Sequence, residues 1–201
     1  MKMIFIPQSH KVITAATVEP VTLAEAKLHL KMDGINVDDN LIEVLIEAAR
    51  QSAEEFCNIK FINTVVEDVF DRFPKGGFQK NDCFYLMIGN VSSVDYVKYY
   101  DENGDLQTWD SSQYLVDNYR KQTRICLMPN VTFPTYDSDR ANGVLVRYNT
   151  GFGATAADVP GAIKQAILLI IGYLYNNRED KVKNLPSLSE HLLQPYKASM
   201  I

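Results

Sequence analysis

The sequence predicts an α+β protein: an antiparallel helical body of two N-terminal helices and a long C-terminal helix, with an inserted antiparallel β domain. Two observations indicate this class. Helical periodicity is confined to the two ends of the chain, and the middle consists of short β-branched and aromatic runs between turns. We therefore assign residues 1–62 and 150–201 to the helical body with its C-terminal tail, and residues 63–149 to the β domain.

The two N-terminal helices carry recognisable start signals. Thr22 followed by Glu25 is a capping box, in which each side chain accepts a hydrogen bond from the backbone N–H of the other residue. Asp33 and Gly34 end this first, short helix. The second helix follows candidate N-caps at 38–40, and small and apolar residues then recur at helical spacing. These residues are Ile42, Leu45, Ala49, Ser52 and Phe56, with Leu41, Ile46 and Ala53 beside them.

The middle of the chain carries the strand signals. We expect strands at 65–70, 83–88, 94–100, 106–109, 114–117, 123–128 and 144–149, where β-branched and aromatic residues gather. Asp101–Gly104 predicts a hairpin turn, because Asn-Gly readily takes positive φ at both central positions. Residues 73–78 and 129–143 are expected to be long loops.

The C-terminal helix, expected from Gly161 to Asn177, has apolar residues on every side. Pro160 fits its first turn, where a missing N–H has no cost. A helix that is apolar all round must be buried all round, either as the central core helix or by packing against neighbouring subunits. Ser187 and Glu190 form a second possible capping box, which starts a short helix at 188–194.

Composition restricts the possible functions. The chain has 201 residues and a formal net charge of −5, and no basic run exceeds two residues. This balance argues against a protein that grips nucleic acid through its phosphates, although nucleic acid could still pass it. Three widely separated cysteines form no disulfide framework and favour a reducing compartment. Without a signal peptide pattern or a long apolar run, we expect a cytoplasmic chain.

No group of residues indicates catalysis or metal binding. The three histidines lack the spacing of metal ligands, and no nucleophile elbow occurs. Cys57, Cys83 and Cys126 lie among apolar residues and are expected to be small buried hydrophobic side chains. We therefore expect no enzyme, no metal and no cofactor.

One motif leaves an alternative open. Gly151–Ala156 matches G-x-G-x-x-A, the pattern that binds dinucleotides at a helix N-terminus. Pro160 places the helix start several residues later, and the preceding strands are expected to be antiparallel. We therefore interpret the segment as a flexible turn. The alternative is a nucleotide-binding enzyme in which this turn binds the nucleotide.

Several motifs follow the order typical of one known family. The opening motifs are 20–30 (PVTLAEAKLHL), 38–42 (DDNLI) and 48–50 (AAR). The later ones are 144–153 (VLVRYNTGFG), 159–160, 163–164, 166–167, 177–179 and 192–196 (LLQPY). In order and spacing the chain resembles the head–tail connector (head-completion or adaptor) proteins of long-tailed bacteriophages, in particular the larger members with a β insertion.

The resemblance implies a structural virion protein at the head–tail junction, assembled in the host cytoplasm. Copies of the chain would form a ring between the portal protein and a tail-side stopper or tail-completion protein. The ring would complete DNA packaging, and DNA would pass through it without sequence-specific binding. No cofactor and no membrane would be involved.

The same resemblance suggests interface residues. Candidates for the ring interface are Ile163, Ile167, Ile170, Ile171, Leu174, Leu45 and Phe56. The tail, residues 184–201, is expected to be poorly ordered in the free subunit and to dock on the portal through Leu188, Leu192, Leu193 and Tyr196. Loops 73–81 and 129–143 are expected to face the tail-side protein or solvent. The alternative from another class is a monomeric, protein-binding β module on a helical stalk.

Overall fold

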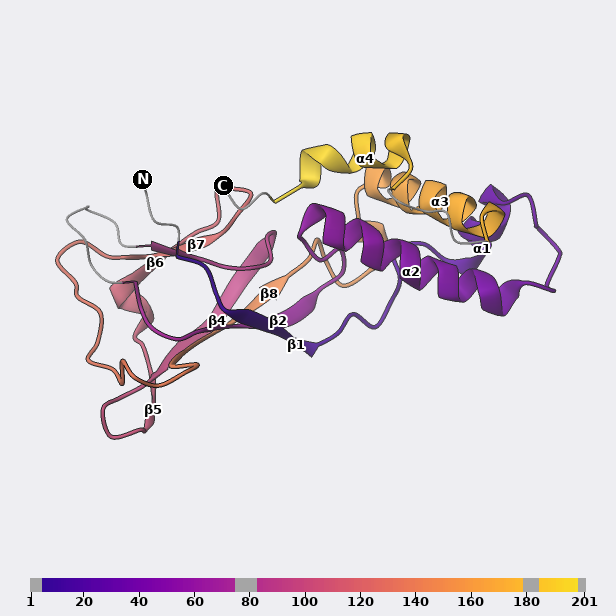
Figure 1. Cartoon of the computed structure of the whole chain (residues 1–201). Helices are drawn as coiled ribbons and strands as arrows, with labels where there is room; N and C mark the ends of the chain where they lie inside the picture. The colour runs from indigo at the N-terminus through magenta and orange to yellow at the C-terminus, as the bar shows by residue number, and fades with distance from the viewer. Residues whose placement is uncertain (1–4, 75–82, 179–184, 199–201) are drawn as a thin grey trace. The chain divides into compact units, whose positions relative to one another are not determined.

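The computed structural model of the chain describes residues 5–74, 83–178 and 185–198. Within these ranges the chain is α+β, with four α-helices and two antiparallel sheets (Figure 1). It forms two compact units. The helical unit comprises the described parts of 16–62 and 152–199, and the β unit comprises the described parts of 1–15 and 63–151.

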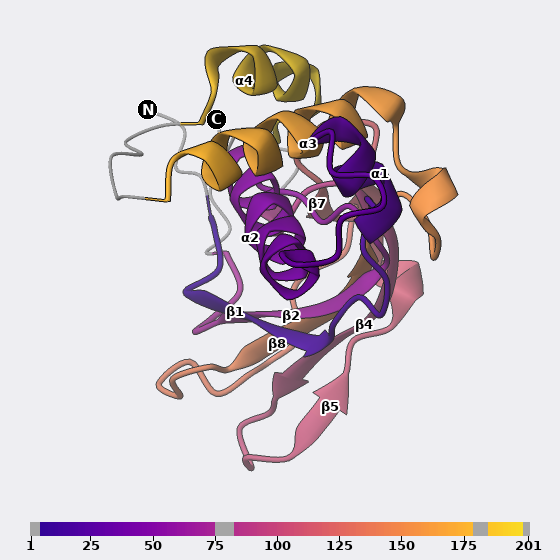
Figure 2. The same cartoon turned by 90° about the vertical axis from the view of Figure 1, so that its right-hand side faces the viewer.

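The helical unit is built around α3. Its helices are α1 (Leu23–His29), α2 (Asp39–Cys57), α3 (Gly161–Asn176) and α4 (Ser187–Leu193). α3 contacts each of the other three helices, and Figure 2 shows it lying between α2 and α4. The unit therefore joins segments from both ends of the chain around one hydrophobic core. No helix within the described ranges is long and apolar enough to cross a membrane.

The predicted start of α1 is confirmed. The backbone N–H of Glu25 donates to Oγ1 of Thr22 at 3.2 Å, and the N–H of Thr22 donates to Oε2 of Glu25 at 2.7 Å. Two donors that the helix itself cannot satisfy are thereby paired. α2 ends at Asn58, which adopts a left-handed conformation with φ of 54°.

Within one copy, the C-terminal helix is buried on one side only, so its burial on every side would need neighbouring subunits. α3 buries one stripe, formed by Ile163, Ala166, Ile167, Ile170 and Ile171. Its remaining apolar residues, Leu168, Leu169, Tyr173, Leu174 and Tyr175, are only half-buried. Neighbouring helices cover α3 on the core side, and the Tyr175 hydroxyl donates a hydrogen bond to Asp38.

The described part of the C-terminal tail is packed rather than poorly ordered. α4 begins after Pro186, whose carbonyl accepts a hydrogen bond from the Ser189 hydroxyl at 2.6 Å. The predicted capping box of Ser187 and Glu190 is therefore wrong. Further along, Ala198 is buried and its N–H donates to the carbonyl of Cys57 at 2.8 Å, which ties the tail to the end of α2.

The β unit holds a five-stranded sheet in the order β1-β2-β8-β4-β5 and a three-stranded sheet in the order β3-β7-β6. The strands are β1 (Ser9–Thr14), β2 (Thr64–Phe70), β3 (Cys83–Tyr85), β4 (Val91–Tyr100), β5 (Leu106–Thr108), β6 (Tyr114–Asp117), β7 (Arg124–Leu127) and β8 (Val144–Thr150). β2 and β8 alternate buried and half-buried residues, so one face of the large sheet supplies the core that it shares with residues of the small sheet.

The predicted hairpin between β4 and β5 forms, but the φ angles and hydrogen bonds of its turn differ from the expectation. Only Gly104 takes a positive φ, of 84°, within the turn. The carboxylate of Asp101 instead closes the turn by accepting the N–H groups of Asn103 at 2.9 Å and Asp105 at 3.0 Å.

The expected long loop at 129–143 is anchored by aromatic residues. Phe133 stacks on Phe73 with ring centroids 4.8 Å apart, and Tyr136 meets Phe73 edge-on at 5.2 Å. Phe73 also contacts Trp109, the only tryptophan of the chain, at 5.3 Å. The loop therefore closes the core of the β unit. Of the other expected loop, residues 75–81 lie outside the described part of the chain.

Two expectations for the β unit are corrected. Residues 1–62 were expected to belong to the helical body, but β1 pairs with β2 and extends the large sheet. Cys83 and Cys126 were expected to be separate buried thiols, but they face each other across β3 and β7 and form a disulfide. The two cysteines are 43 residues apart in the sequence, so their pairing could not be predicted without the register of β3 and β7. Cys57 stays a buried free thiol.

Candidate interaction surfaces

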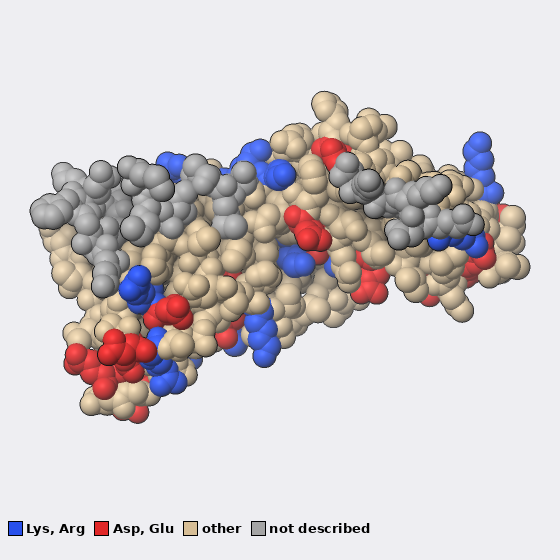
Figure 3. Space-filling model, in the orientation of Figure 1, with Lys and Arg blue, Asp and Glu red and all other residues tan. Residues whose placement is uncertain are grey.

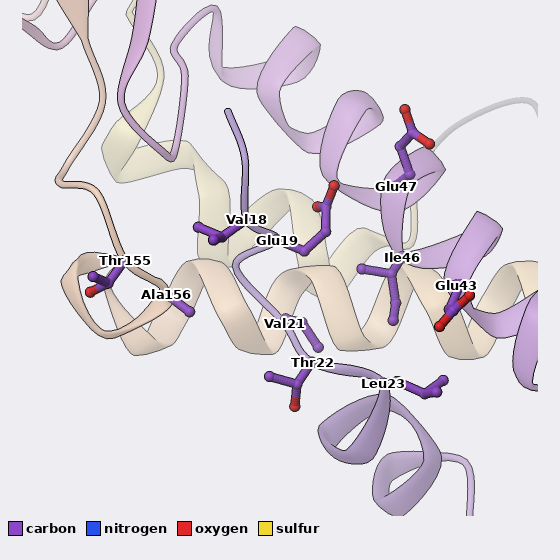
Figure 4. Close-up of a pocket in the computed structure, with 10 residues that line it drawn as sticks. All are labelled: Val18, Glu19, Val21, Thr22, Leu23, Glu43, Ile46, Glu47, Thr155 and Ala156. Carbon is purple, nitrogen blue, oxygen red and sulfur yellow. The ribbon is translucent and has the colours of Figure 1, made fainter. Parts of the chain in front are cut away.

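The helical unit carries a shallow pocket of about 670 Å³. It is lined by Val18, Glu19, Val21, Thr22, Leu23, Glu43, Ile46, Glu47, Thr155 and Ala156. Figure 4 shows Thr155 and Ala156 at one end of the pocket and the α2 residues at the other. Val21 and Ile46 are buried and give an apolar floor. The lining residues include three carboxylates and no cation. We call this site the acidic pocket.

A charged network fixes one wall of the acidic pocket. Nε of Arg50 donates to Glu19 at 2.7 Å, and Arg50 also pairs with the buried Glu54 at 3.2 Å. Glu54 in turn accepts hydrogen bonds from Lys60 at 2.8 Å and from the backbone N–H of Phe61 at 3.1 Å. Since breaking a buried ion pair is strongly destabilising, this network holds the segments before and after α2 in place.

The glycine motif has a structural role in its own turn. A Cβ on Gly153 would lie 2.3 Å from the carboxylate of Asp158, so only glycine leaves room for that side chain. Asp158 accepts hydrogen bonds from the N–H and the hydroxyl of Thr155, both at 2.9 Å. α3 begins only at Gly161. A carboxylate thus occupies the turn where a dinucleotide site would receive an anionic pyrophosphate.

Gly153→Ala is therefore expected to destabilise the helical unit by about 1 kcal/mol, because the added methyl group displaces Asp158 and breaks the cap. Thermal unfolding followed by circular dichroism measures the change. We also expect that ATP or NAD leaves the melting temperature of the native sequence unchanged. A rise in melting temperature with either nucleotide that is lost in Gly153→Ala would contradict this interpretation and support the nucleotide-binding alternative.

A buried acid lies in the core of the β unit. Asp68 is fully buried and accepts hydrogen bonds from the N–H of Met87 at 2.6 Å and from the hydroxyl of Tyr148 at 3.0 Å. The Tyr148 hydroxyl also accepts from the N–H of Ile88 at 3.2 Å. Burial raises the pKa of Asp68 to about 7, although both hydrogen bonds lower it. It lies within the core of the β unit, where its hydrogen bonds join β2 to β8 and to Met87.

The described residues hold no group of three or more histidine, cysteine or acidic side chains placed to bind a metal ion. The only free thiol, Cys57, is buried, and burial raises its pKa to about 12. A thiol with such a pKa is not a nucleophile at neutral pH.

The structure divides the predicted ring-interface residues into two sets. Ile163, Ile167, Ile170 and Ile171 are buried in the core of their own helical unit, so they have no surface to offer a neighbour, and these four predictions are corrected. Leu45, Phe56 and Leu174 are half-buried and stay predictions. Lys197 lies over the ring of Phe56, with Nζ 4.5 Å from its centroid.

The predicted portal-docking residues also differ in exposure. Leu193 is buried against the helical core, so its prediction is corrected too. Leu192 and Tyr196 are half-buried, and Tyr196 contacts Phe152 at 6.1 Å between ring centroids. Leu188 is 56% exposed on α4 and has surface left for a partner.

Some exposed apolar residues were missed from the sequence. Val37 is 90% exposed before α2, Val44 is exposed on α2, and Tyr119 is 99% exposed between β6 and β7. The position of Val44 on the polar face of α2, between the acidic residues Glu43 and Glu47, is a signal that the sequence contains. No sequence signal separates Tyr119 from the other tyrosines of the β unit, of which Tyr85 and Tyr148 are buried.

Charge is unevenly distributed over the described surface. On the face shown in Figure 3, acidic side chains gather at the end of the β unit that carries the β4–β5 hairpin. That hairpin contains Asp101, Glu102 and Asp105. Lysine and arginine are scattered over the same face and form no continuous basic patch among the described residues. This face therefore lacks the electrostatic footprint of a protein that holds DNA by its phosphates.

Comparison with known proteins finds one family match, over part of the chain. The model of the phage gp6-like head-tail connector proteins matches residues 20–105, which run from just before α1 to the turn that follows β4. The resemblance to head–tail connectors is confirmed. A search of curated protein sequences finds no match.

Solved structures that are similar to this chain come from gene transfer agent (GTA) particles. A chain of the virion of the native GTA particle superposes with a TM-score of 0.76 at 17% identity, covering 96% of both chains. A chain from the neck of the empty particle, computed with C6 symmetry, gives 0.75 at 17% identity and covers 96% of this chain and 97% of that one. A chain from the neck of the native particle, computed with C12 symmetry, gives 0.68 at 16% identity with the same coverage. At these identities the similarity shows a shared fold.

Proposed function

We propose that this chain is a structural protein of the head–tail junction in a tailed phage or phage-like particle. Copies of it form a ring between the portal protein and a tail-side protein, and DNA passes through the ring. The observation that carries the proposal is the match of nearly the whole fold to chains of the GTA neck, together with the connector-family match over 20–105. The cyclic symmetry named for those necks supports a ring.

The helical unit is proposed to form the body of the ring. The β unit, which consists of β1 and the segment between α2 and α3, is proposed to reach an adjoining protein. Half-buried Leu45 and Leu174, with exposed Val44, supply apolar surface for contacts between copies. Leu188 on α4 is the strongest remaining candidate for docking on the portal, because it combines an apolar side chain with exposure.

The net charge of −5 suits a channel for DNA. Multiplied around a ring, an acidic surface repels phosphates, so DNA moves through without adhering to the wall. A basic channel of the same diameter would bind DNA and slow its passage.

Particles assembled without this chain test the proposal. We expect heads that have packaged DNA but carry no tail, or heads that have lost their DNA, and electron microscopy distinguishes both from tailed particles. Supplying the chain from a plasmid should restore tails. Tailed, DNA-filled particles in its absence would overturn the proposal.

If the chain is instead a monomeric, protein-binding β module, a different result is expected for the chain bound to its partner. Such a module requires one copy, or a few independent copies, on a partner protein, and no ring. Light scattering alone does not separate the two functions, because a connector can stay monomeric until the portal templates its ring. Imaging of portal-bound chain does separate them, since only the connector forms a closed ring on the portal.

A further inference from the structure

The turn between β6 and β7 presents an exposed aromatic side chain. Within this turn, residues 118–123, Tyr119 is 99% exposed, and Arg120 and Lys121 beside it are exposed too. Tyrosine and arginine are enriched in protein interfaces, where the ring fills a pocket and the cation pairs at the rim. We call residues 118–123 the Tyr119 turn.

The base of the Tyr119 turn is firmly held. Gln122 and Thr123 are buried. The side-chain amide of Gln122 donates to the carbonyls of Leu86 and Met87, and the carbonyl of Thr123 accepts the N–H of Leu86 at 3.0 Å. The exposed tip is therefore positioned before any partner binds, which lowers the entropy cost of binding.

The acidic pocket of the helical unit has the complementary properties. Its floor is apolar, at Val21 and Ile46, and its volume of about 670 Å³ exceeds that of one aromatic side chain. Glu43 and Glu47 are exposed on the α2 side of the pocket, and Glu19 lies on the neighbouring segment (Figure 4). The pocket can therefore receive a tyrosine ring and pair with cations next to it.

We propose that the Tyr119 turn of one copy inserts into the acidic pocket of a neighbouring copy, with Arg120 and Lys121 paired with Glu43 and Glu47. This inference rests on the proposed ring. A contact that joins two different surfaces of the same chain is heterologous, and a heterologous contact closes a ring when every copy both gives and receives it. Both surfaces are present on this chain, so no other partner is needed to satisfy them.

Reciprocal charge reversal tests the contact. Two variants, Arg120→Glu with Lys121→Glu and Glu43→Lys with Glu47→Lys, should each raise the concentration needed for ring formation on portal-bearing heads by at least fivefold, the effect of about 1 kcal/mol. The quadruple variant, with both reversals, should recover most of the loss. Lys11→Glu with Arg72→Glu, two exposed cations of the β unit, is the matched control and should assemble normally. Trp109 fluorescence and circular dichroism verify that every variant is folded.

Cross-linking between separately marked copies tests proximity. One copy carries Tyr119→Cys and the other Thr155→Cys, so a bismaleimide can join them only across two chains. The native cysteines do not compete, because Cys57 is buried and the other two form a disulfide. Assembled necks should give a cross-linked dimer with this pair and none when Thr155→Cys is replaced by His191→Cys on α4.

The outcomes separate this contact from the proposed function. Recovery in the quadruple variant together with the specific cross-link supports the contact. If rings form but the reversals have no effect, the quadruple variant does not recover, or the cross-link is absent, the contact is overturned while the connector function stands. If no ring forms with the native sequence, both are overturned.

Discussion

Replacing Phe73 with alanine is expected to lower the free energy of unfolding of the β unit by about 4 kcal/mol. Phe73 is buried at the centre of an aromatic cluster. Its ring contacts those of Phe84, Tyr99, Trp109, Phe133 and Tyr136, with centroids between 4.8 and 6.4 Å away. Truncation would leave a cavity and remove the support of the 129–143 loop at once.

Trp109 provides the measurement for Phe73→Ala. It is the only tryptophan and lies buried in the same cluster, so its fluorescence reports unfolding of the β unit in urea. Leu115→Ala on β6 is the matched control, because that side chain is mostly exposed and should cost less than about 0.5 kcal/mol. A loss below about 1 kcal/mol for Phe73→Ala would show that the cluster is not the core of the unit.

The second large effect is a dependence of β-unit stability on pH that comes from Asp68. Its pKa of about 7 in the folded protein lies above the usual value near 4, so the folded state binds the proton more tightly than the unfolded state. This contribution to stability is fully present below about pH 4 and is lost as pH rises to about 7. The expected decrease is about 4 kcal/mol.

Asp68→Asn removes the charge at nearly constant volume and should remove this contribution. Trp109 fluorescence in urea at pH 5 and pH 8 measures the difference between native sequence and variant. We expect the variant to be the more stable of the two at pH 8. His10→Gln is the control, since His10 lies opposite Asp68 in the β1–β2 register. If the change in the free energy of unfolding between pH 5 and pH 8 persists in Asp68→Asn and disappears in His10→Gln, the histidine is responsible.

Local signals predicted most of the elements. The Thr22–Glu25 box, the spacing of apolar residues in α2 and the β-branched runs of β2 and β8 are all properties of neighbouring residues, and each appears in the structure. β1 was missed because its residues are all exposed and therefore show no alternation of apolar and polar side chains.

Properties that depend on distant residues could not be predicted. The Cys83–Cys126 disulfide and the burial of Asp68 arise from strand pairing. The ring-interface prediction failed for the isoleucines of α3. Their apolar character shows that they are buried, but not whether helices of the same chain or of a neighbouring copy bury them. The acidic pocket combines residues from 18–23, α2 and 155–156, which no sequence spacing connects. The likeness to connectors was predictable because its motifs are short and keep their order.

Electron cryomicroscopy of assembled particles can show whether this chain forms a ring at the head–tail junction. We expect a closed ring of copies of this chain, coaxial with the portal and with an open channel for DNA. The half-buried and exposed apolar residues of α2 and α3 should be covered by neighbouring copies. Density for this chain away from the head–tail junction, or at the junction as isolated copies without contacts between them, would contradict this expectation.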